Sequence, residues 1–68
     1  MTDLPLLLSV NATAEALGIG RSKCYELILR GELRSLTIGS RRLVPRRAIE
    51  DYIAEALQQI ENEEKVIP

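Results

Sequence analysis

The stretch AEALGIGRSKCYELILRG, residues 14–31, decides the fold because it holds two short helices and the turn between them. Gly18 suits the left-handed backbone conformation that commonly ends a helix, and Ile19 places an apolar side chain in the turn. The second helix is predicted from about residue 20 to residue 30, with Gly31 directly after its end. Two helices joined by a short glycine-containing turn are typical of a helix-turn-helix.

The first helix is predicted to begin after Ser9 or Asn11, since either side chain can accept a hydrogen bond from a free backbone N–H, and to end at Leu17. Val10 and Ala14 share its apolar face with Leu17. The second helix has an apolar face of its own, which we expect to point inward: Cys24, Leu27 and Ile28.

Two β-prone segments follow, on either side of Gly39-Ser40, and predict a hairpin. Glycine at the first position of a two-residue loop suits a type II′ turn. The register is open at this point: a two-residue loop sets Leu36 opposite Leu43, and a three-residue loop sets it opposite Val44. In both registers the arginines of segment 41–42 lie at or beside the tip.

A third helix is predicted to carry Pro45 in its first turn, where a missing N–H costs nothing. The residues before the first helix, 1–8, are expected to be an extended lead-in. Residues 1–60 should form the domain, and the acidic tail 61–68 should be disordered. Apolar residues recur at helical spacing in the third helix, and we expect the whole stripe to pack on the core: Ile49, Tyr52, Ile53, Ala56, Leu57 and Ile60. The sequence thus predicts a mainly α winged helix-turn-helix with a small β-hairpin.

The composition limits what can stabilise a chain of 68 residues with one cysteine and no histidine. An internal disulfide is excluded, and a zinc site of the usual ligands is not expected. Stability must come from packed aliphatic side chains, helped by self-association or a ligand. The free thiol and the lack of a signal-like segment favour the cytoplasm. The apolar run Leu4–Leu8 is interrupted by proline and is too short to span a bilayer.

The charge is sorted along the chain although its total is only −1. Residues 21–47 hold eight Lys and Arg against two Glu, whereas residues 48–68 hold six Asp and Glu against one Lys. The local field matters more to a polyanion than the total charge. The basic middle therefore favours a nucleic-acid partner, and a merely solvated charged surface is the alternative.

Seven short segments follow one another in a set order: LSV (8–10), AEALGI (14–19), YELI (25–28), RGEL (30–33), IGSRR (38–42), VPR (44–46) and AI (48–49). In that order they resemble the excisionase family of DNA-binding domains, small relatives of the MerR-type winged helix found in phages and integrative elements. The resemblance covers about residues 7–54. The sequence departs from the family pattern at Gly20, where a capping serine is common, at Thr13, where alanine is usual, and at Arg42, where an aromatic residue is frequent.

The resemblance implies that the second helix lies in the major groove of double-stranded DNA and that the wing reaches the neighbouring minor groove. Many family members are recombination directionality factors, which bend attachment-site DNA and favour excision by a partner site-specific integrase. Others regulate transcription in a mobile element, and the sequence does not separate the two roles. Cooperative self-association on DNA fits a module that buries little surface alone.

The predicted DNA contacts follow from the geometry of such a domain. A recognition helix touches base edges mainly through its first turns, arginines suit a narrow minor groove, and other basic residues hold phosphates. We assign Arg21, Ser22, Lys23, Tyr25, Glu26 and Arg30 to the recognition helix, Arg41 and Arg42 to the wing, and Arg34, Arg46 and Arg47 to phosphates.

Catalysis is not expected, because the chain offers no pocket or histidine around which a reaction could be assembled. We expect no cofactor, no metal, no membrane and no small-molecule substrate. Cys24 is interpreted as a core residue, and neither Tyr25 nor Tyr52 as a nucleophile. A further alternative is a protein-interaction module that acts through the acidic C-terminal helix.

Overall fold

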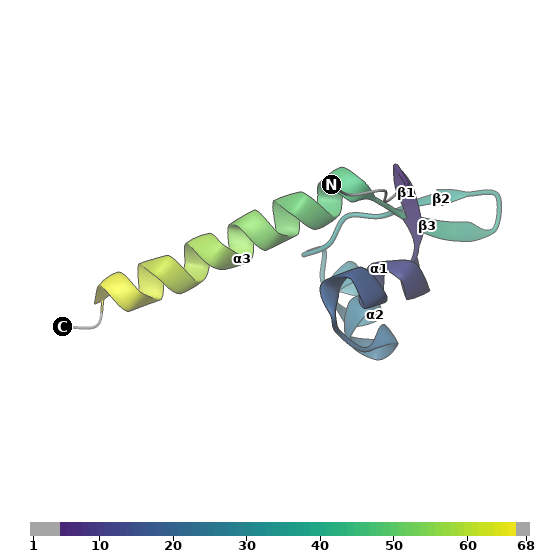
Figure 1. The fold of residues 1–68 in the computed structure, drawn as a ribbon. Helices are drawn as coiled ribbons and strands as arrows, with labels where there is room; N and C mark the ends of the chain where they lie inside the picture. Colours follow the sequence, from purple (N-terminus) through teal and green to yellow (C-terminus); the bar gives the residue numbers. More distant parts are fainter. Residues whose placement is uncertain (1–4, 67–68) are drawn as a thin grey trace.

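The structure, a computed structural model, describes the backbone of residues 5–66 and the side chains of residues 5–61. Its elements are β1 (Leu7–Ser9), α1 (Val10–Leu17), α2 (Arg21–Leu29), β2 (Leu36–Ile38), β3 (Arg41–Pro45) and α3 (Arg46–Val66) (Figure 1). The predicted winged helix-turn-helix, mainly α with a hairpin, is confirmed. Residues 1–4 of the expected lead-in and residues 67–68 of the expected tail lie outside the described part.

The start and the end of α1 are both fixed by local hydrogen bonds. Ser9 is the N-cap, and its Oγ accepts from the Ala12 N–H at 3.1 Å. The Thr13 hydroxyl is completely buried and donates to the Ser9 carbonyl at 2.8 Å, which satisfies the hydroxyl inside the core. Gly18 ends the helix with φ 72°, the left-handed conformation expected of it.

Helix α2 begins without a side-chain cap, and the turn after its end places a residue in the core. Gly20 occupies its N-cap position and offers no side-chain acceptor. Gly31 follows the C-terminal end with φ 78°. The N–H groups of Glu32 and Leu33 then donate to the Leu27 carbonyl at 3.0 and 3.2 Å, and this turn places Leu33 in the core with 1% of its surface exposed.

The hairpin belongs to a three-stranded antiparallel sheet with the order β1-β3-β2. Leu36 lies opposite Leu43 and Ile38 opposite Arg41, so the loop is the two-residue one, Gly39-Ser40. Gly39 has φ 63° and no described non-glycine residue has a positive φ, as a type II′ turn requires. The lead-in is extended as expected, but its pairing as β1 with β3, Leu8 opposite Val44, was not predicted.

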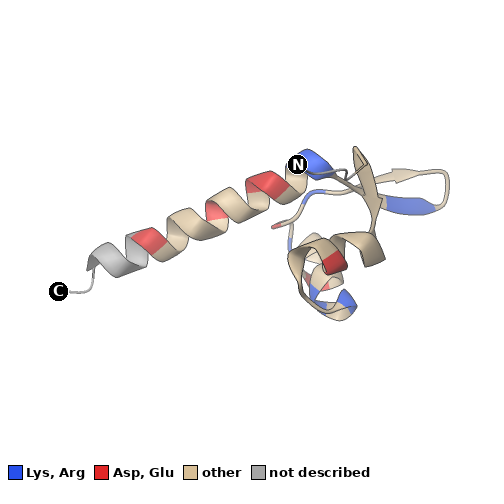
Figure 2. Cartoon of the chain, in the orientation of Figure 1, with Lys and Arg blue, Asp and Glu red and all other residues tan. Residues whose placement is uncertain are grey.

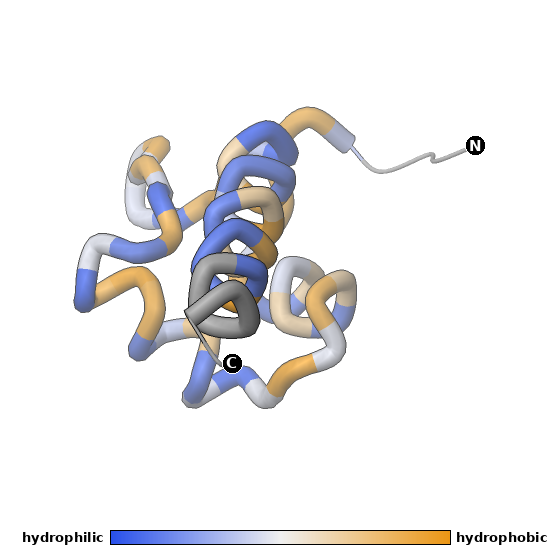
Figure 3. The backbone as a smooth tube through the Cα atoms, turned by 90° about the vertical axis from the view of Figure 1, so that its left-hand side faces the viewer, coloured by the Kyte–Doolittle hydropathy of each residue, from blue (hydrophilic) through white to orange (hydrophobic). Residues whose placement is uncertain are grey.

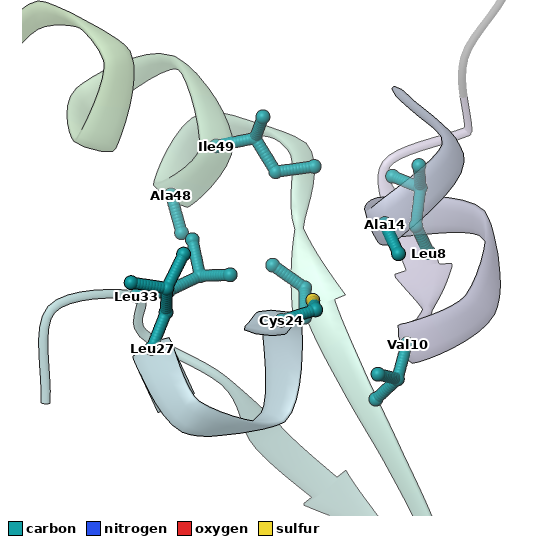
Figure 4. Packing of buried hydrophobic residues seen from close by; sticks show 9 residues of the cluster. Leu8, Val10, Ala14, Cys24, Leu27, Leu33, Ala48 and Ile49 are labelled. Carbon is teal, nitrogen blue, oxygen red and sulfur yellow. The ribbon is translucent and has the colours of Figure 1, made fainter. Parts of the chain in front are cut away.

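The core lies where α1, α2, the sheet and the first turn of α3 meet (Figure 4). The inward-facing residues of α2 behave as expected, because Cys24 and Leu27 are buried and Ile28 packs against them. Burial of aliphatic side chains stabilises such a core by about 1.5–3 kcal/mol for each large residue. Its members are Leu8, Val10, Ala14, Cys24, Leu27, Leu33, Val44, Ala48 and Ile49.

The expectation that the whole apolar stripe of α3 packs on the core is wrong. Only its beginning does so: Ile49 is buried, and Tyr52 is half-buried against the core. The helix then projects away from the other elements in Figure 1, and Figure 3 views it nearly end-on. The physical reason is that helical periodicity marks an apolar face without supplying a partner for it. Ile53, Leu57 and Ile60 remain 43%, 54% and 51% exposed.

Both ends of α3 differ slightly from the sequence-based boundaries. Pro45 is the last residue of β3, and the helix begins at Arg46. The backbone stays helical to Val66, through residues that were expected to be a disordered tail. The division of the chain at residue 60 stays a prediction. No helix within residues 5–66 is long and apolar enough to cross a membrane.

Candidate nucleic-acid interface

One face of α2 presents polar and charged side chains to solvent. Because Cys24 and Leu27 are buried, helical geometry turns the side chains on the opposite side of the helix towards solvent. The four residues that sequence geometry turned away from the inward face are exposed in the structure, as is Arg21 at the N-terminal end: Ser22, Lys23, Glu26 and Arg30. The face is therefore accessible to a partner along its whole length.

Glu26 forms ion pairs with two basic residues on this face. Its carboxylate lies 3.6 Å from the Lys23 ammonium and 3.1 Å from the Arg30 guanidinium, and Arg30 also lies 3.2 Å from Glu32. Each partner is about half exposed, and such ion pairs contribute at most about 1 kcal/mol. A phosphate or a base edge can therefore replace them at small cost.

Arg21 and Tyr25 form a pair at the N-terminal end of α2. The Arg21 guanidinium lies 5.7 Å from the centre of the Tyr25 ring, within the range of a cation–π contact. The contact limits the positions that Arg21 can sample while leaving its N–H groups free for acceptors. Arg21 thus presents a partly oriented positive charge.

The two arginines of the wing stand directly after the turn. Strand alternation sends Arg42 to the same face of β3 as the buried Val44, which is the face that the helices cover, and sends Arg41 to the other face. Arg42 donates from Nη1 to the Ser35 Oγ at 3.0 Å, a contact that holds the guanidinium beside the start of β2. The two arginines therefore have different surroundings despite being adjacent.

Helix α2 and the wing meet at a shallow depression. Its lining joins the first turn of α1, the first turns of α2 and the tip half of β3: Ser9, Val10, Asn11, Arg21, Tyr25, Arg41 and Arg42. Figure 2 shows the positive residues of β3 and those of α2 on the globular part of the molecule, whereas negative residues follow α3 away from it. The depression thus collects three arginines from two separate segments of the chain.

The remaining three basic residues lie elsewhere. Arg46 and Arg47 border a groove between the sheet and the first turn of α3, together with Leu36 and Pro45. Arg34 borders a different groove, where acidic residues such as Glu32 are its neighbours. The structure does not bring these three residues to the depression, and their contact with phosphates stays a prediction.

Comparison with known proteins identifies the family. A family model described as a helix-turn-helix domain matches residues 7–56. A "Probable excisionase" of Saccharopolyspora erythraea is 46% identical over 54 residues, which are 79% of this chain and 55% of that protein. An "Excisionase" of Streptomyces ambofaciens is 41% identical over 56 residues, which are 82% of this chain and 90% of that protein. The chain belongs to the excisionase family of helix-turn-helix DNA-binding domains.

The family membership confirms the resemblance inferred from the sequence, and the family is one of DNA-binding domains and not of enzymes. The excisionase-family domain spans about half the length of the Saccharopolyspora relative. No solved structure matches the chain.

Sequence reasoning missed two residues at the interface of this excisionase-family domain. Asn11 is exposed in the first turn of α1 and borders the depression, and Ser35 holds Arg42. Asn11 reaches the wing only because β1 pairs with β3, which sets Ser9 opposite Leu43. No local signal in the sequence announces that pairing.

The depression offers cationic and hydrogen-bonding groups and no reactive ones. Cys24 lies completely buried on the inner side of α2, and burial raises the pKa of its thiol, so the thiol stays protonated and inert. Among the described residues, no group of three His, Cys, Asp or Glu could hold a metal ion. The arrangement fits recognition of an anionic polymer.

Proposed function

We propose that this excisionase-family domain binds double-stranded DNA with α2 in the major groove and the β2–β3 wing in the adjoining minor groove. The observation that carries the proposal is the depression that Arg21 and Tyr25 of α2 line together with Arg41 and Arg42 of the wing. Two positive segments that approach each other from different elements suit a duplex better than a single basic patch would, because a duplex presents phosphates on both sides of each groove.

Within this proposal the residues divide into two groups. Ser22, Lys23 and Glu26 lie on the exposed first turns of α2, where a recognition helix meets base edges. Lysine matches the acceptors of guanine, and a carboxylate can accept from the amino group of cytosine. Arg30 lies further along α2 and suits a phosphate, as do the N–H groups of Asn11. The arginines of the wing suit the negative potential of a narrow minor groove.

Both relatives are named as excisionases, which supports a role in recombination. We propose that the domain acts in the cytoplasm on attachment-site DNA, bends it, and so favours excision by a partner integrase. Adjacent copies bind cooperatively on neighbouring sites. Bending is expected because a wing and a helix in adjoining grooves gain contacts when the duplex curves towards them.

A salt series on a duplex taken from beside an attachment site tests the DNA contact. Neutralised phosphates release counterions, so the affinity should fall steeply with salt. Arg42→Ala should lower the slope of log K against log salt by about one and weaken binding to all sequences alike. Lys23→Ala should cost about 1–3 kcal/mol on the preferred site and less on others. Gln58→Ala, on α3, is the control and should change nothing.

The outcomes separate the parts of the proposal. An affinity that does not depend on salt overturns the DNA contact as a whole. Arg47→Ala decides whether phosphates are also contacted from the groove beside α3. A plasmid excision assay with the partner integrase tests the recombination role, and a reporter on the neighbouring promoter tests the alternative of a transcriptional regulator. DNA binding without any effect on excision overturns the recombination role alone.

A further inference from the structure

The exposed apolar residues of α3 form one uncovered surface, the α3 stripe, which consists of Ile53, Leu57 and Ile60. Their spacing of four and three residues puts them on one side of the helix. Each keeps between 43% and 54% of its surface in solvent. Tyr52 and Ala56, on the adjacent side, border the groove that faces the Gly31–Glu32 turn. The stripe is therefore separate from the part of α3 that faces its own domain.

A second apolar surface lies on the side of the sheet that faces away from the helices. Leu8 and Val44 are buried on the helix side, so alternation directs their strand neighbours to the opposite side. Ile38 is 55% exposed and Leu36 is 38% exposed. We call this surface the outer sheet face, and it consists of the exposed Leu36 and Ile38 with the half-buried Leu7, Leu43 and Pro45.

The two surfaces carry different charges at their edges. By helical spacing, Glu50 and Glu61 flank the α3 stripe, and no Lys or Arg occurs between residues 48 and 64. Arg41 pairs with Ile38 at the edge of the outer sheet face, and Arg47 borders its groove, with Glu50 and Asp51 further along. Two α3 helices side by side would set carboxylates against carboxylates. An α3 stripe at the Arg41 edge of an outer sheet face sets carboxylates near an arginine.

The stripe cannot reach the outer sheet face of its own chain. Helix α3 begins at Arg46, directly after β3 ends at Pro45, and continues without a break to Val66. No loop is present that could fold the helix back. Figure 1 shows the sheet at one end of the molecule and the free part of α3 pointing away from it. Only a second copy can therefore bring the two surfaces together.

We propose that the α3 stripe of one copy packs on the outer sheet face of the next copy. Because the two surfaces differ, the contact is heterologous and does not close into a dimer, so it joins copies in a row. Three apolar side chains and their rim bury less than the ~1,200 Å² of a stable interface, so the contact is weak in free solution. Neighbouring copies held on one duplex gain effective concentration, a consequence that rests on the proposed DNA binding.

Cysteine cross-linking tests the contact directly. Cys24 is completely buried and its thiol pKa is raised, so an added surface cysteine is the reactive one. A size-tagged chain with Leu57→Cys is mixed with an untagged chain with Ile38→Cys, at high protein concentration, and treated with a bismaleimide. The proposal expects mixed-size products to exceed same-size products several-fold. Gln58→Cys and Thr37→Cys, on the opposite sides of the same two elements, are the matched controls and should give few products.

The alternatives give other products. Same-size products from Leu57→Cys in excess overturn the proposal in favour of paired α3 helices. That pairing should strengthen as salt screens the like charges, whereas the proposed contact should weaken. Absence of products in solution and on DNA also overturns the proposal and leaves the stripe to a partner of another kind.

A second experiment measures binding to two duplexes of random sequence, one that accommodates a single copy and one that accommodates several. Leu57→Glu and Gln58→Glu add the same charge to α3. Both variants should match the wild type on the short duplex. On the long duplex, Leu57→Glu should lower the cooperativity of binding about tenfold and Gln58→Glu should not. Equal cooperativity in both variants overturns the inference, whereas failure of every protein on the short duplex overturns the DNA binding instead.

Discussion

Helix α2 and the free part of α3 show how differently two helices can depend on the rest of a small domain. The apolar pattern of α2 is short and modest, yet Cys24 and Leu27 are buried because α1 and the sheet face them. The pattern of α3 is the longest in the chain, yet Leu57 and Ile60 remain in solvent. Whether an apolar helix face is buried thus depends on the elements that lie opposite it. Helical periodicity in the sequence indicates only that such a face is present.

A pair of identical Leu→Ala substitutions tests whether the core and the free part of α3 differ in burial. Leu33→Ala removes a fully buried side chain and should cost about 2–5 kcal/mol of unfolding free energy, through lost burial and a cavity. Leu57→Ala should cost less than about 0.5 kcal/mol, because its side chain is 54% exposed and lies outside the core cluster. Urea denaturation at low protein concentration measures both. Equal losses would mean that α3 is covered in solution.

The thiol of Cys24 reports on the burial of the inner side of α2. Burial raises its pKa in the folded state above the unfolded value, so its contribution to stability is complete below the unfolded pKa and declines as the pH rises through the folded pKa. Denaturation over an alkaline pH series should show a loss of at most about 1.4 kcal/mol per pH unit from this group. Cys24→Ala, the control, should lack that component. Parallel curves for the two proteins would place the thiol in solvent.

The caps of the first two helices give a smaller effect. Ser9 accepts a hydrogen bond at the start of α1, so Ser9→Ala should lower the unfolding free energy by about 1 kcal/mol. Ser22→Ala, in the exposed first turn of α2, should change it by less than about 0.5 kcal/mol. Thermal melts followed by circular dichroism suffice. A larger loss for Ser22 than for Ser9 would contradict the capping geometry.

The smallest expected effect is a gain. Gly20 stands at the uncapped start of α2 with φ −74°, and a Cβ there would meet nothing within 4 Å. Gly20→Ser should therefore raise the unfolding free energy by a few tenths to about 0.5 kcal/mol. Gly18→Ser is the matched control and should lower it by about 1 kcal/mol, because φ at that position is +72°. Thermal melts of both variants provide the measurement.

The sequence predicted those parts of the fold that depend on residues close together in the chain. Glycines after each of the first two helices fixed their ends to within a residue, and the Gly39-Ser40 turn placed the two arginines beside the tip. The pairing of β1 depended on three residues meeting a distant strand, which no local pattern encodes. For the same reason the basic residues of α2 and the wing could be named from the sequence, whereas Asn11 and Ser35 could not.

The direct junction between β3 and α3 has a mechanical consequence. Pro45 and Arg46 are adjacent, and the Arg46 N–H donates to the Leu6 carbonyl at 2.8 Å, so the direction of the helix is set by the sheet. A helix of about 20 residues spans about 30 Å, so a 10° tilt of the sheet would move the far end of α3 by about 5 Å. Helix α3 is thus a lever whose free end amplifies small rotations of the sheet.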